Sequence, residues 1–196
     1  MAKFLMEPQR ALDRLKEGNL RYMAGRRIGD VSPARREQTL AAGQRPFAVI
    51  VTCSDSRVIP EVIFSAGIGD LFIIRIAGNV IDDHQLGSIE YAVEHLGCGL
   101  VVVLGHTHCG AVDAAIHHEP SGYIRFITDE IVKAIGAEQD GERACRLNAL
   151  FSKAAIERSL QIQEDERAYG LRVEAAMYRL EDGSVSFFDG PEDARI

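Results

Sequence analysis

Residues 99–110, GLVVVLGHTHCG, join an apolar run to a turn that is rich in metal-binding side chains. The run 100–104 contains no polar residue and has the length of a strand that is buried on both faces. His106, His108 and Cys109 follow it and offer three possible metal ligands. We therefore expect a buried strand whose carboxyl end carries a site, completed by side chains at the end of a neighbouring strand.

Apolar runs and helical patterns alternate along the rest of the chain. Strands are expected at 47–51, 71–77 and 99–105, and in RVEAAMYRL (172–180) and SVSFF (184–188) around the turn EDG. Helices are expected at 7–24, from Ser32, near 60–66, at 85–97 and over most of 109–169. This alternation predicts an α/β protein with a mostly parallel sheet covered on both faces, in which ligands bind beyond the carboxyl ends of the strands.

Composition limits the classes of function. The 196 residues suit one domain, and the net charge of −7 argues against a nucleic-acid partner. No apolar run is long enough for a membrane span, and the first residues lack the apolar core of a secretory signal, so we expect a cytoplasmic protein. Four cysteines in such a chain favour metal binding or catalysis over disulfides, although Cys98 and Cys145 are expected to be core residues.

The three candidate ligands in the opening stretch are not equivalent. If the strand ends near Gly105 and a helix begins near Cys109, the side chains of His106 and Cys109 can share one crevice, and His108 points elsewhere. Cys53 ends the preceding apolar run and is the best candidate for a third ligand. Two cysteines and one histidine suit zinc, and a vacant fourth position is typical of catalytic zinc.

The segment CSDSR, residues 53–57, adds a carboxylate and a guanidinium beside this site. In an extended segment, Cys53, Asp55 and Arg57 would point to one side. Arg57 could then hold Asp55 bidentately and keep it off the metal, leaving the carboxylate to orient a zinc-bound water. The alternative is a surface ion pair on a turn, which the adjacent metal candidates make the weaker interpretation.

CSDSR, followed by AGN (77–79) and GHTHCG (105–110), resembles the β-class carbonic anhydrases, and the similarity extends over most of the chain. The resemblance implies one Zn²⁺ per subunit on Cys53, His106 and Cys109, with Asp55 and Arg57 as catalytic residues. It implies attack of zinc-bound hydroxide on carbon dioxide to give bicarbonate and a proton. The implied fold is one three-layer α/β/α domain over 1–196, with a helical arm (1–43) and a core (44–196) of four parallel strands plus an antiparallel edge strand.

The family also implies substrate contacts and a subunit interface. By their places in its motifs, Gln44 and Gly110 match groups that hydrogen-bond the substrate, and Phe72, Ala77 and Tyr91 match apolar pocket walls. Plain core packing is an equally good interpretation of those three apolar residues. A homodimer or homotetramer is implied, with the active site near the dimer interface, so that Gln44 could serve the neighbouring subunit.

Some positions depart from the family pattern. Ile50 stands where members that close the site at low pH have tryptophan, and the chain has no tryptophan, which favours the open arrangement. Ile76 replaces an asparagine of many members, and His117 and His118 are expected to be solvated. The alternatives are hydrolysis of carbonyl sulfide or carbon disulfide on the same scaffold, and an inactive zinc-binding relative.

Overall fold

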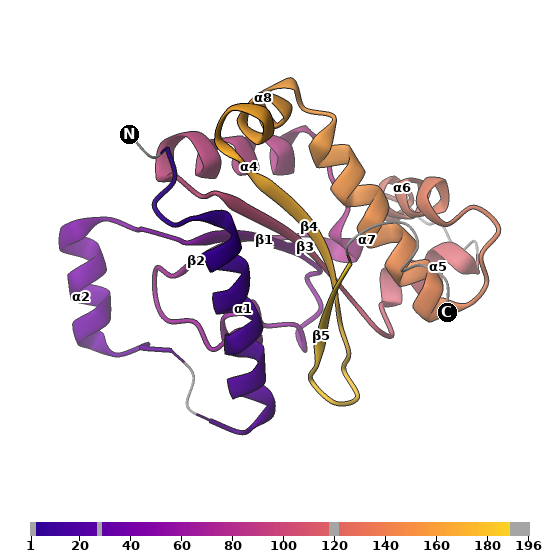
Figure 1. Cartoon of the computed structure of the whole chain (residues 1–196). Coiled ribbons are helices and arrows are strands. Elements are labelled where there is room, and N and C mark those ends of the chain that lie inside the picture. The colour runs from indigo at the N-terminus through magenta and orange to yellow at the C-terminus, as the bar shows by residue number, and fades with distance from the viewer. Residues whose placement is uncertain (1–2, 27–28, 118–121, 189–196) are drawn as a thin grey trace.

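The computed structural model describes residues 3–26, 29–117 and 122–188. Its centre is a five-stranded sheet in the order β2-β1-β3-β4-β5. The first four strands run parallel and β5 is antiparallel at one edge, which confirms the predicted sheet (Figure 1). The strands are β1 (Ala48–Thr52), β2 (Leu71–Arg75), β3 (Leu100–His106), β4 (Arg172–Tyr178) and β5 (Val185–Phe188).

Helices cover both faces of the sheet, because alternate residues of each strand point to opposite sides. Ile50 and Val102 face α1 and α3, whereas Val51 and Val103 face α4, α7 and α8. These side chains are fully buried, and each contributes about 1.5–3 kcal/mol through burial. The helices are α1 (Pro8–Met23), α2 (Pro33–Ala42), α3 (Pro60–Ile63), α4 (Asp83–Leu96), α5 (Gly110–Ile116), α6 (Ile124–Ile135), α7 (Gly141–Glu157) and α8 (Leu160–Tyr169).

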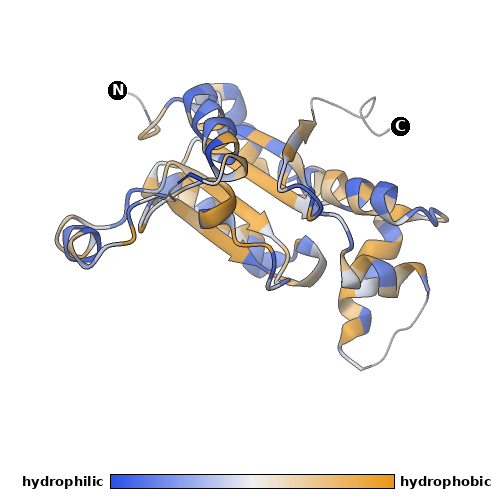
Figure 2. Ribbon diagram, turned by 90° about the horizontal axis from the view of Figure 1, so that it is seen from below, coloured by the Kyte–Doolittle hydropathy of each residue, from blue (hydrophilic) through white to orange (hydrophobic). Residues whose placement is uncertain are grey.

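The two N-terminal helices differ in their packing. Leu12 and Leu15 of α1 are buried against the sheet, so α1 is part of one of the covering layers. By contrast, α2 has no buried residue and projects from the body of the molecule (Figure 1). Figure 2 shows the same contrast in hydropathy, with hydrophobic strands at the centre and a largely hydrophilic α2. Among the described residues, no helix is long and apolar enough to cross a membrane.

Two element boundaries differ from expectation close to the predicted site. The expected strand 71–77 ends at Arg75, and Ala77–Asn79 form a 3₁₀ turn, η1, in which Gly78 has a φ of 67°. The positive φ favours glycine at this position, and a Cβ there would in addition displace the tip of the Ile131 side chain of α6. The opening strand continues to His106 instead of ending near Gly105, which places His106 on the sheet itself.

Candidate metal centre

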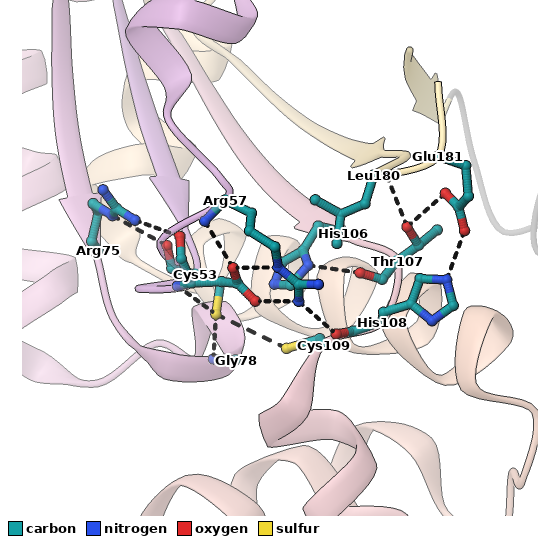
Figure 3. A network of polar contacts seen from close by, with 11 residues as sticks. Cys53, Arg57, Arg75, Gly78, His106, Thr107, His108, Cys109, Leu180 and Glu181 are labelled. Atoms are coloured by element: carbon teal, nitrogen blue, oxygen red, sulfur yellow. Dashed lines mark hydrogen bonds and ion pairs between the residues drawn. The ribbon is translucent and has the colours of Figure 1, made fainter. Parts of the chain in front are cut away.

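The ends of β1 and β3 lie side by side and bring three predicted ligands together. Thr52 pairs with Leu104 in the parallel ladder, so Cys53, just after β1, lies beside the end of β3. His106 is the last residue of β3, and Cys109 precedes the first residue of α5. One ligand atom from each of these three residues lies within 4.8 Å of the others, and all three side chains are buried (Figure 3).

His106 has the tautomer that a metal ligand requires. Its Nδ1 lies 2.9 Å from the backbone oxygen of Thr107, and because a carbonyl only accepts, Nδ1 must carry the proton. Nε2 then presents its lone pair, and it is buried with no hydrogen-bond partner among the described residues. A buried nitrogen without a partner is costly unless it binds something, so this atom fits a metal ion.

The two cysteines behave as a coupled pair of sulfur donors, with their Sγ atoms 4.0 Å apart. The hydrogen bond from Cys109 is the main reason that the pKa of Cys53 falls to about 4, and the backbone N–H groups of Gly78 and Asp55 add to it. The same partner raises the pKa of Cys109, because a second negative charge so close is unfavourable. A bound cation would remove that conflict, since two thiolates and a neutral histidine suit zinc.

Asp55 and Arg57 form the bidentate pair that the sequence predicts, although not through an extended segment. The chain turns at residues 56–57, and the backbone N–H of Arg57 donates to Asp55 Oδ1 at 2.9 Å. Arg57 Nε and Nη2 donate to the two carboxylate oxygens at 3.0 and 2.8 Å. These bonds hold the pKa of Asp55 well below its usual range. Asp55 is not part of the described metal-ligand group, and the open arrangement stays a prediction.

Three supporting residues could not be found from the sequence. Arg75, at the end of β2, donates to the backbone oxygens of Cys53 and Asp55 at 3.3 and 2.7 Å. From α7, Asn148 donates to Gly78 O at 2.7 Å and Ser152 to the Asn79 oxygen at 2.9 Å, so α7 holds the turn whose N–H reaches Cys53. No local pattern marks these residues, because each acts on a segment distant in sequence.

The remaining cysteines are buried, as expected for core residues. Burial raises the pKa of Cys98 to about 12 and, together with weaker effects, that of Cys145 to about 11. Cys145 also lines a cavity of about 260 Å³, together with Cys109 and carboxylates that include Glu142 and Glu181. All four cysteines are free, and no disulfide connects them.

The other candidate substrate contacts are spread over three places. Gly110 is the first residue of α5 and Ala77 the first of η1, so both adjoin the metal-ligand group. Phe72 and Tyr91 lie together, with ring centroids 6.4 Å apart, on β2 and α4. Gln44 is exposed on the segment between α2 and β1. Their roles in substrate binding stay predictions.

The structure also places three residues to which the sequence analysis assigned no role in the site. His108 is outside the ligand group and its side chain is 68% exposed, with Nε2 bonded to Glu181. Ile76 packs against the apolar cluster around the two sulfur ligands. The side chain of His117 is exposed, as expected, and His118 lies outside the described residues.

Comparison with known proteins places this site in a family. The carbonic anhydrase family model matches residues 48–185, which contain the three candidate ligands and the Asp55–Arg57 pair. The chain belongs to the β-carbonic anhydrase family. Carbonic anhydrase 2 of Mycobacterium tuberculosis is 40% identical over 193 residues, covering 93% of each chain. The predicted family and enzyme class are therefore confirmed.

Solved β-carbonic anhydrase structures share the fold. The enzyme of Aspergillus fumigatus superposes with a TM-score of 0.72 at 28% identity, covering 95% of this chain and 93% of the other. A β-carbonic anhydrase described as tetrameric, from Sordaria macrospora, gives a TM-score of 0.72 at 24% identity and covers 81% of this chain and 88% of the other. The three-layer arrangement predicted from the sequence is thus the β-carbonic anhydrase fold.

Proposed function

We propose that this β-carbonic anhydrase is a cytoplasmic zinc enzyme that hydrates carbon dioxide reversibly to bicarbonate. The observation that carries the proposal is the buried Cys53–His106–Cys109 group with the Asp55–Arg57 pair beside it. When bound, zinc would act as a Lewis acid and lower the pKa of a coordinated water toward neutrality, which supplies the nucleophile. Among the residues that the structure describes, three ligands meet at this position, and a fourth site for water is typical of catalytic zinc.

The ligand residues balance the charge of the metal ion and orient their donor atoms toward it. Two thiolates balance the charge of the cation, and the Thr107 carbonyl keeps His106 in the tautomer that directs Nε2 inward. The N–H groups of Gly78 and Asp55 stabilise the thiolate form of Cys53. These contacts preorganise the three donors before a metal ion arrives.

Asp55 would act as a hydrogen-bond acceptor beside the metal. Its depressed pKa keeps the carboxylate ionised at neutral pH, and Arg57, which donates to both carboxylate oxygens, would keep them from binding the metal. An ionised carboxylate so placed accepts the hydrogen bond of the nucleophile and orients its lone pair toward the substrate carbon. The Gly110 N–H, at the start of α5, would contact the product oxygens.

A second copy of the chain would complete the substrate pocket. β2 is the sheet edge opposite β5, and the side chains of its residues 71–74 are half-buried in the single chain. Phe72 and Tyr91 lie at this edge, and Tyr91 is 49% exposed. An exposed tyrosine ring beside a half-buried phenylalanine at an unpaired strand edge favours a subunit interface, in which Gln44 would reach the neighbouring site.

The test combines metal analysis with stopped-flow measurement of carbon dioxide hydration. We expect one zinc per chain, and a large loss of kcat in Asp55→Ala with zinc retained. Asp129→Ala is the matched control, since this aspartate is exposed on α6. A metal-free protein, or equal rates for Asp55→Ala and the control, would refute the proposal. Sulfide release from carbonyl sulfide without carbon dioxide hydration would favour the hydrolase alternative.

A further inference from the structure

The loop between two of the metal ligands contains an unfavourable backbone conformation. His108 has a φ of 55°, in the left-handed region that side chains with a Cβ rarely adopt. This turn reverses the chain between His106, at the end of β3, and Cys109, at the start of α5. Such a conformation persists only where neighbouring groups hold it.

Glu181, in the turn after β4, holds both residues of this loop that are not ligands (Figure 3). Its Oε1 accepts from His108 Nε2 at 2.8 Å, and its Oε2 accepts from the Thr107 hydroxyl at 2.9 Å. Two further hydrogen bonds join the same elements: Leu180 N–H donates to the Thr107 hydroxyl oxygen at 3.0 Å, and Thr107 N–H donates to Tyr178 O at 3.0 Å. The β4–β5 turn thus fixes the loop from outside the site.

The carbonyl groups of the same two residues face the site. Thr107 O accepts the Nδ1 proton of His106, which directs Nε2 to the metal position. His108 O accepts from Nη2 of Arg57 at 3.4 Å, on the side of the guanidinium that also holds Asp55. A change in the loop would therefore move a ligand and the catalytic pair together.

We infer that Glu181 is a positioning residue that holds the 106–109 loop in its left-handed turn and thereby orients His106 and Arg57. This inference rests on the proposed function. Glu181's own backbone N–H, then the Thr107 hydroxyl and His108, lower its pKa, so the carboxylate is available as a double acceptor. No change of protonation is needed, because a neutral histidine donates through Nε2.

The test compares Glu181→Ala with Asp182→Ala. Asp182 lies in the same turn, but its carboxylate bonds Ser184 and not the loop. In Glu181→Ala we expect zinc release to a chelator to accelerate roughly tenfold or more, with a similar loss in kcat/KM and an altered visible spectrum of the cobalt-substituted protein. Asp182→Ala should match the wild type in all three.

Repeating the Glu181→Ala substitution in a His108→Gly variant separates loop positioning from a general effect on stability. Glycine adopts a φ of 55° without penalty, so His108→Gly should reduce the effect of Glu181→Ala on zinc release to about threefold or less. Equal effects of Glu181→Ala in both backgrounds, or wild-type metal release in the single variant, would overturn the inference.

A measurement on metal-free protein keeps this test separate from the proposed function. The histidine ring NMR signals of wild type should show His106 protonated at Nδ1, and Glu181→Ala should mix the two tautomers. This result would support the positioning role even if the wild type failed to hydrate carbon dioxide. An unchanged tautomer in Glu181→Ala would count against it.

Discussion

Asn148 offers a sharp test of how α7 supports the metal centre. Its side chain is 1% exposed, and Nδ2 donates to Gly78 O at 2.7 Å. Asn148→Ala would leave this buried carbonyl without its partner, at a cost of about 1–3 kcal/mol. The lost volume of roughly 25 Å³, at about 24 cal/mol per Å³, adds roughly 0.6 kcal/mol. We therefore expect the free energy of unfolding to fall by about 2–4 kcal/mol.

The same substitution should weaken metal binding, because Gly78 N–H donates to the Cys53 sulfur at 3.3 Å. A loosened η1 turn should lower zinc affinity roughly 10–100-fold. The assays are urea unfolding of the chelated protein and zinc competition with a chromogenic chelator. Arg143→Ala, on the same helix, is the control; its side chain is 52% exposed, so it should change stability by no more than about 0.5 kcal/mol.

Asn148→Asp distinguishes the hydrogen bond from packing. Aspartate fills the same space, but its ionised carboxylate offers no donor to the Gly78 carbonyl, so the variant should be at least as unstable as Asn148→Ala at neutral pH. An aspartate variant of wild-type stability, or an alanine variant that loses less than about 1 kcal/mol, would refute the reasoning.

Further predictions concern the catalytic pair, a buried thiol, a helix contact and the metal. Arg57→Lys retains the charge but not the bidentate geometry, so kcat/KM should fall roughly 10–100-fold with zinc content unchanged; an unchanged kcat/KM would contradict this. Cys98 has a folded pKa of about 12 against an ordinary value of 9.0, so the unfolded state ionises first as pH rises and stability falls above about pH 9. Between pH 8 and 10, ionisation of Cys98 should lower the free energy of unfolding by about 1.4 kcal/mol. Urea titrations at these two pH values should show that Cys98→Ala removes this contribution. Gly18→Ala places a Cβ 2.0 Å from the Phe64 backbone oxygen and should lower the free energy of unfolding by about 1–3 kcal/mol, measured by the same titration. Zinc at a thousandfold excess over Kd should stabilise the protein by about 4 kcal/mol, seen as a fall in Tm on chelation, whereas identical Tm values would exclude tight binding.

The sequence by itself determined the sheet and the three candidate ligands. The run 100–104 is apolar at every position, as a strand covered on both faces requires, and the runs predicted as strands at 47–51 and 71–77 correspond to β1 and β2 of the same sheet. Because parallel strands end at one edge, Cys53 could be placed beside His106 before any coordinates. Asp55 and Arg57 could be paired because the contact is local, although a turn joins them and not the extended segment that the sequence predicts.

Only the tertiary structure decided what holds the site in place. Arg75, Asn148 and Glu181 act on segments 20, 70 and 73 residues away in sequence. Their side chains follow no periodic pattern, since each is fixed by the packing of β2, α7 or the β4–β5 turn against another element. The left-handed φ of His108 was also not predicted, because only a small fraction of histidines adopt it and the contacts of the folded loop decide which of them do. The candidate ligands could be predicted because they depend on residue type and strand order. The hydrogen bonds that hold the site in place could not, because they form only when distant segments pack together.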